Sequence, residues 1–141
     1  MRVLSRAEAL AFLVEQPRTA KLATVRPDGR PHVVPVWIDV EGGEVYFTSW
    51  HTTVKVNNMR QDDRIALCVD DEVPPYAFCL VEGRAELIYD LEQLRYWATR
   101  IAGRYMGADQ AEAFGRRNAV PGELLVRVRI DRVVAYSGIA D

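Results

Sequence analysis

Short segments with the composition of β-strands, separated by tight turns, make up most of the chain. Residues 20–25 and 124–130 alternate apolar and polar positions, as expected of a strand with one buried face. Proline and glycine in residues 26–30, and the glycine pair within 41–43, are typical of tight turns that join antiparallel neighbours. The pattern predicts a mainly β fold built as a meander. The predicted strands are residues 20–25, 33–40, 44–49, 64–69, 76–88 and 124–130.

Helix signals occur between these strands. Ser5 and Glu8 have the spacing of a capping box, which predicts a helix that runs to about Glu15. Asp90 is placed to cap a second helix, whose apolar residues recur with helical spacing. Two shorter helices are expected at about residues 53–60 and 109–117. Gly83, inside the predicted strand 76–88, suggests a bulge that bends the sheet toward closure.

The segment from Val33 to Val40 is apolar almost without interruption, so both faces of this strand are expected to be covered. Pro35 lies in its middle and cannot donate to a strand ladder. The strand is therefore expected at a sheet edge or beside an interruption. Backbone polar groups left without a ladder need a partner, and a flat heterocycle with carbonyl and imide edges is one candidate.

A candidate anion site follows the next strand. Thr48 and Ser49 end that strand, Thr53 can cap the following helix, and Lys55 lies in its first turn. Free helix N–H groups, hydroxyls and an ammonium that converge on one point favour a phosphate. The alternative is that Thr52 or Thr53 only caps the helix and that Lys55 is a solvated surface lysine. The adjoining strand with its proline favours a phosphate-bearing aromatic cofactor.

Several motifs occur in an order that resembles a known superfamily. The sequences of residues 22–37, 45–49 and 55–67, continued by 81–87 and 104–107, resemble the pyridoxamine 5′-phosphate oxidase-like split-barrel superfamily. Within it they are most similar to the flavin/deazaflavin oxidoreductases, many of which use coenzyme F420, an 8-hydroxy-5-deazaflavin. The resemblance implies one domain over residues 1–141, a split β-barrel of antiparallel strands with flanking short helices.

The resemblance also implies a site. Lys55, Ser49 and Thr53 are expected to hold the cofactor phosphate and Thr48 the ribityl chain, while residues 35–37 line the ring and His32 borders it. Tyr76 and Phe78 are expected near a cofactor bound mainly by the other subunit of a homodimer, or else are ordinary core aromatics. The candidate cofactor-binding residues are His32, Val34, Pro35, Val36, Trp37, Thr48, Ser49, Thr53, Lys55, Asn58, Tyr76 and Phe78.

The implied function is hydride transfer between reduced F420 and a small organic acceptor, with no catalytic side chain required because the cofactor carries the chemistry. FMN is the alternative cofactor; a flavin- or haem-binding carrier and a cofactor-free structural dimer are alternative functions. Some relatives have an arginine two residues before the lysine, where this chain has Thr53. Arg104 and Tyr105 are a possible wall on the substrate side.

Composition and missing motifs argue against several other classes of function. The 141 residues carry a formal net charge of −2 with scattered basic residues, so no nucleic-acid surface is expected. No apolar run is long enough to cross a membrane, and a cytoplasmic location is expected. Cys68 and Cys79 are expected to be buried thiols, and the two histidines do not suggest a metal site. The motifs GxSxG, GxGxxG and Walker A are absent.

Overall fold

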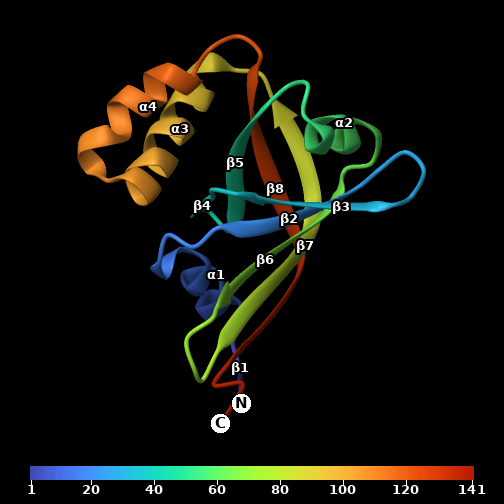
Figure 1. Ribbon diagram of the computed structural model, residues 1–141, viewed down its shortest axis with the longest axis vertical. Coiled ribbons are helices and arrows are strands. Elements are labelled where there is room, and N and C mark those ends of the chain that lie inside the picture. The colour runs from blue at the N-terminus through green and yellow to red at the C-terminus, as the bar shows by residue number, and fades with distance from the viewer.

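The computed structural model describes residues 1–141 as one curled, eight-stranded antiparallel sheet with helices around it (Figure 1). The strand order is β3-β2-β6-β7-β8-β5-β4, and β1 pairs with β8 where the two chain termini lie together. The elements are β1 (Arg2–Val3), α1 (Arg6–Glu15), β2 (Ala20–Val25), β3 (Pro31–Val36), β4 (Asp39–Glu41), β5 (Glu44–Trp50), α2 (Val54–Gln61), β6 (Arg64–Asp71), β7 (Ala77–Ile88), α3 (Leu91–Met106), the 3-10 turn η1 (Ala108–Gln110), α4 (Ala111–Asn118) and β8 (Glu123–Ser137).

A short connecting segment closes the barrel, because its two end strands, β3 and β4, are not hydrogen-bonded to each other. β3 and β4 stand at opposite ends of the strand order, yet only Trp37 and Ile38 separate them in sequence. The three residue steps from Val36 to Asp39 span at most about 11 Å, so the sheet must curl until its two ends are near each other. This geometry is a split barrel, as the resemblance implied. We refer to residues 37–38 as the barrel break.

One apolar cluster fills the barrel interior. Its largest fully buried side chains include Phe47, Leu22 and Leu67, which come from three different strands. A smaller cluster lies between α3 and the outer face of the barrel, where the rings of Tyr46 and Trp97 stack with centroids 3.7 Å apart. The helical hairpin formed by α3, η1 and α4 is held against the barrel by this second cluster, on the left of Figure 1.

The predicted strand from Val33 to Val40 is wrong in two respects. It ends at Val36, because the chain there leaves β2 and crosses to the other end of the sheet before β4 begins. Its faces are also not both covered, since Val33 is 62% exposed and no element of the chain packs over that side. The edge position inferred from Pro35 is confirmed, because β3 pairs only with β2.

The other predicted elements are present with shifted ends. The capping box of Ser5 and Glu8 begins α1, and Asp90 caps α3. The strand predicted at 124–130 continues to Ser137, because it pairs along the whole of β7 and with β1. Strand β1 was not predicted; it is only two residues long and exposed.

Gly83 lies at the bulge between β7 and β8, where the register shifts after Glu82. A Cβ atom at Gly83 would stand 2.3 Å from the backbone oxygen of Arg129 and 3.0 Å from a methyl group of Val128. The strands therefore approach so closely at this bend that only glycine fits without a shift of backbone.

We expect Gly83→Ala to lower the free energy of unfolding by about 1–3 kcal/mol, the usual cost of overpacking a site that cannot relax. Urea denaturation of the purified protein measures it. Gly103→Ala is the control, because a Cβ there would meet only the Cβ of Ala111 at 3.4 Å, and alanine is favoured over glycine inside a helix. Equal stability of the two variants would contradict the assigned role of Gly83.

Candidate cofactor-binding cavity

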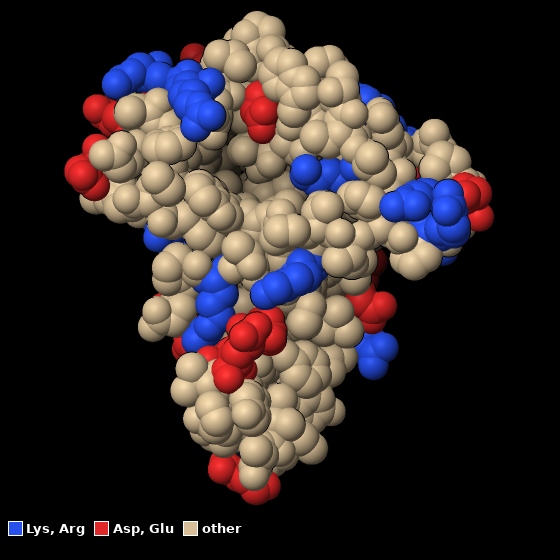
Figure 2. All heavy atoms as spheres, in the orientation of Figure 1, with Lys and Arg blue, Asp and Glu red and all other residues tan.

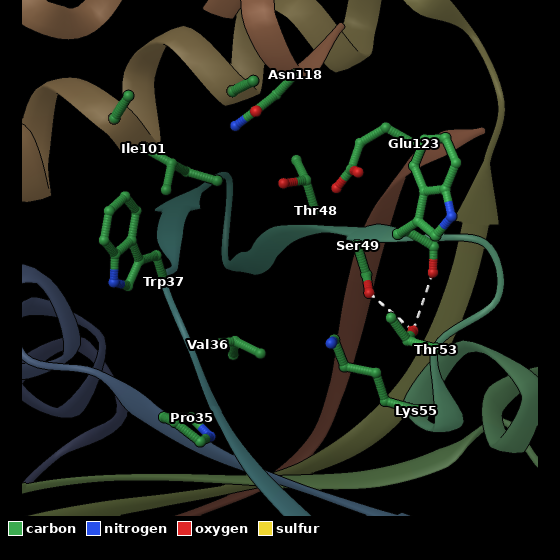
Figure 3. A pocket seen from close by; sticks show the side chains of 13 residues that line it. Pro35, Val36, Trp37, Thr48, Ser49, Thr53, Lys55, Ile101, Asn118 and Glu123 are labelled. Atoms are coloured by element: carbon green, nitrogen blue, oxygen red, sulfur yellow. Dashed lines mark hydrogen bonds between the residues drawn. The ribbon is translucent and has the colours of Figure 1, made fainter. Parts of the chain in front are cut away.

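An open cavity of about 400 Å³ lies between the barrel and the helical hairpin. Figure 2 shows it as a hollow between the hairpin and the upper barrel, with acidic and basic groups on its rim. Its walls come from the end of β3, the end of β5, the start of α2, the facing side of α3, the end of α4 and the start of β8. The side chains on these walls are shown in Figure 3.

The first wall is the end of the edge strand. Pro35, Val36 and Trp37 line the cavity where β3 leaves its ladder. Since β3 has a neighbour on one side only, the backbone groups on its other side have no strand partner. This wall therefore offers apolar surface together with unpaired backbone polar groups, and both suit the edge of a planar ring.

Tyr105 holds the indole ring of Trp37 in place. Its ring stacks on Tyr105 with centroids 5.0 Å apart and an interplanar angle of 1°. The Tyr105 hydroxyl donates to the backbone oxygen of Arg18 at 2.8 Å and accepts from the N–H of Ile38 at 3.1 Å. Trp37 is 39% exposed and lines the cavity, so it presents a fixed aromatic surface to whatever enters.

Arg104 has a structural role in the same place. Its guanidinium donates to the backbone oxygens of Ile38, Val14 (3.2 Å) and Gln16 (3.3 Å). Arg104 and Tyr105 therefore satisfy both backbone groups of Ile38 at the barrel break. The suggestion that they form a wall for substrate is not supported: neither lines the cavity, and both are bound to the backbone.

The opposite wall begins at the N-terminus of α2. Thr53 caps this helix: its hydroxyl donates to the Trp50 oxygen at 2.9 Å and lies 3.4 Å from the Val56 N–H and 3.0 Å from the Ser49 hydroxyl. Lys55 follows in the first turn, is half-buried, and points into the cavity in Figure 3. Thr53 thus caps the helix and also lines the cavity, and Lys55 is not a solvated surface lysine.

Lys55 shares the cavity with one carboxylate. Glu123, at the start of β8, also lines it, and these two are the only charged residues that do. Burial lowers the pKa of the Lys55 ammonium, and the charge of Glu123 opposes this shift. Burial raises the pKa of Glu123, opposed by hydrogen bonding to Thr48 and by the charge of Lys55. The cavity therefore carries one positive and one negative group and no net charge.

Seven of the predicted site residues meet at this cavity, and three do not although they lie nearby in sequence. His32 lies on β3, and its Nδ1 is buried without a hydrogen-bond partner. Val34 packs against the barrel core. Asn58 is 2% exposed and donates to the Thr24 hydroxyl at 2.9 Å, on the side of α2 that faces β2. The residues that meet are Pro35, Val36, Trp37, Thr48, Ser49, Thr53 and Lys55.

Tyr76 and Phe78 lie away from this cavity. Tyr76, whose backbone has a left-handed φ of 67°, lines a separate groove with Phe12 and Ser137, and the ring of Phe78 packs near that of Tyr136. Their predicted contact with a cofactor held by another subunit concerns a second copy of the chain and stays a prediction.

Sequence reasoning missed the part of the cavity contributed by distant segments. Trp50 and Glu123 are directly opposite each other in the ladder between β5 and β8. Ala98 and Ala102 flank Ile101 on one face of α3, and this helical spacing could have marked a shared surface. No local signal shows that this surface faces β3. The missed residues are Trp50, Ala98, Ile101, Ala102, Asn118 and Glu123.

Comparison with known proteins identifies the family. The family model described as pyridoxamine 5′-phosphate oxidase matches residues 6–136, so nearly the whole chain belongs to this family. An F420H(2)-dependent biliverdin reductase from Mycobacterium tuberculosis (strain CDC 1551 / Oshkosh) is 31% identical over 134 residues, which are 95% of this chain and 90% of that protein.

Solved structures agree with this assignment. A conserved hypothetical protein from Mycobacterium tuberculosis superposes with a TM-score of 0.85 and 27% identity, over 96% of this chain and 86% of that one. An F420 reductase superposes with a TM-score of 0.69 and 28% identity, over 87% and 94% of the two chains. The fold and the branch implied by the sequence motifs are therefore confirmed at the level of the family. No helix of the chain is both long enough and apolar enough to cross a membrane.

We expect Tyr105→Phe to lower the free energy of unfolding by about 1–3 kcal/mol, because the N–H of Ile38 then loses its partner at the barrel break. The phenyl ring should preserve the stack with Trp37. Tyr96→Phe is the matched control, since the exposed Tyr96 hydroxyl makes only solvent-accessible contacts, at 3.5 Å to Glu41 and 3.2 Å to Arg100. Chemical denaturation of both variants makes the comparison, and equal losses would contradict the role of Tyr105.

Proposed function

We propose that this protein binds coenzyme F420 in the cavity between the barrel and the helical hairpin and uses its reduced form to reduce a small organic acceptor. The observation that carries the proposal is that the open end of β3, with Trp37 fixed beside it, faces the same cavity as the N-terminus of α2 and Lys55. One planar molecule that bears a phosphate can contact all of them at once.

The ring fits the β3 wall on physical grounds. A deazaflavin presents carbonyl and imide groups along one edge, and these suit the unpaired backbone groups beside Pro35 and Val36. Trp37 offers an aromatic surface already immobilised by Tyr105, so little side-chain entropy is lost when a ring contacts it. The small side chains of Ala98 and Ala102 leave room on the α3 side.

The phosphate fits the α2 wall. Lys55 supplies a positive charge that is partly removed from water, and the first turn of α2 supplies N–H groups and the positive end of its dipole. Ser49 lies beside Thr53 and can donate its hydroxyl to an anion. Thr48, which precedes Ser49 on β5 and lies beside Glu123, would take a ribityl hydroxyl.

A bound reduced deazaflavin supplies the hydride, so the protein contributes placement and the exclusion of water. The β3 wall fixes the edge of the ring and the α2 wall fixes its phosphate. The cavity opens to solvent between these walls, which leaves space for an acceptor. Biliverdin is the first acceptor to test, because the relative at 31% identity is named for its reduction.

F420 is preferred to FMN because two similar proteins are named for F420: the biliverdin reductase and the F420 reductase. A homodimer is part of the proposal. Val33 and Val54 are exposed apolar residues on elements that also contribute to the cavity, so a second copy could cover them and complete the site. Tyr76 and Phe78 are the residues proposed to reach the cofactor of the partner subunit.

Lys55→Ala should weaken F420 binding about ten- to a hundredfold, the effect of losing one charge-assisted hydrogen bond to phosphate. Lys21→Ala, which removes the only other lysine and its ion pair with Asp70, is the matched control and should bind as the unmodified protein does. Fluorescence titration with F420 measures both, and unchanged affinity of the Lys55 variant would refute the phosphate assignment.

Turnover separates an enzyme from a carrier. With reduced F420 in excess, we expect the absorbance of the oxidised cofactor to appear only when an acceptor such as biliverdin, a quinone or an enone is added. Tight binding of F420, FMN or haem without turnover of any acceptor would favour the carrier function instead.

A further inference from the structure

Glu123 is the one acidic residue that lines the cavity, and the proposed function assigns no role to it. Its position is built into the fold. Glu123 pairs with Trp50 in the ladder between β5 and β8, and the preceding Gly122 accepts hydrogen bonds from the backbone and the Nδ1 of His51 at 2.8 and 2.9 Å. A Cβ at Gly122, which has a φ of +101°, would collide with the Trp50 ring at 2.3 Å.

A carboxylate near an anion site is unexpected, because its negative charge weakens the attraction between Lys55 and a bound anion. Burial alone does not explain it, since an uncharged residue would fill the same space at lower cost. In Figure 3 the Glu123 carboxylate points into the cavity beside Thr48, on the opposite side from Lys55. A ligand phosphate at the α2 wall would therefore share the cavity with one positive group, Lys55, and one negative group, Glu123.

We propose that Glu123 is a specificity-determining residue that admits a phosphate diester, which carries one negative charge, and disfavours a phosphate monoester, which carries two. The inference rests on the proposed function, and it names how the same site distinguishes F420 from FMN. In F420 the phosphate is a diester, whereas in FMN it is a terminal monoester.

The charges of the cavity give the physical reason. A monoester has a second pKa near about 6 and is close to doubly charged above pH 7. Lys55 can neutralise one of these charges, and no second lysine or arginine lines the cavity to neutralise the other. The second charge is exposed to Glu123 in a site partly withdrawn from water, where charges interact more strongly than in bulk. The single charge of a diester phosphate can be neutralised by Lys55 alone.

The test uses three ligands that share the deazaflavin ring: the free ribityl alcohol, its 5′-phosphate monoester, and F420. Each is titrated at pH 8 by fluorescence into the unmodified protein and into Glu123→Gln, which keeps the shape and removes the charge. We expect Glu123→Gln to strengthen binding of the monoester at least about fivefold more than binding of F420, and to leave the alcohol unchanged.

Two further variants serve as controls. Glu112→Gln, on the exposed face of α4, changes the net charge equally and should alter none of the three affinities. Glu123→Asp keeps the charge and should keep the discrimination against the monoester, which a role in folding or shape alone does not predict. Circular dichroism checks that each variant is folded.

The outcomes are distinct. If Glu123→Gln changes the affinities of monoester and F420 by the same factor, selection by charge is overturned while the proposed function stands. If all three ligands weaken together, Glu123 binds the ribityl hydroxyls that they share, and the inference is likewise overturned. If the unmodified protein binds none of the three, the proposed function fails and this inference with it.

Discussion

The structure depends on how the chain crosses the barrel break. A two-residue crossing between opposite ends of a sheet leaves Ile38 with a backbone donor and acceptor that no strand can pair, and unpaired buried backbone groups are costly. Tyr105 and Arg104, adjacent on α3, supply the missing partners. The crossing that closes the barrel is therefore stabilised by two side chains of a helix, 66 and 67 residues further along the chain.

The same contacts create the cavity. Because α3 must reach Ile38, the helical hairpin is held beside the free edge of β3 and forms a wall opposite the N-terminus of α2. The stack of Tyr105 on Trp37 then fixes the orientation of an indole that would otherwise be a mobile exposed side chain. Arg100 and Asp39 strengthen the attachment one turn earlier on α3 with an ion pair at 3.1 Å. The contacts that stabilise the barrel closure thus also hold the walls of the candidate site in place.

Local signals predicted the fold and about half of the residues that line the candidate cavity. The capping box at Ser5, the cap at Thr53 and the bulge at Gly83 depend on residues close in sequence, and all three are present. The break at Trp37 was missed because it depends on which strands the chain must connect, and an apolar run looks the same on either side of it. Glu123 was missed because its position depends on pairing across some 70 residues.

The exposed side of β3 links the site to assembly. A continuous apolar run predicts a strand covered on both faces, yet Val33 is open to solvent in the single chain. The sequence pattern is consistent with burial if a second copy covers β3, because exposure of contiguous apolar surface is otherwise unfavourable. Any such partner must approach at the edge of the cavity, since residues 33 and 35 belong to the same short strand. Val33 and Pro35 are two residues apart and therefore lie on the same face of β3, whereas Val34 and Val36 face the core. The wall proposed to contact the ring and the surface proposed to contact a partner would then be neighbouring parts of one strand face.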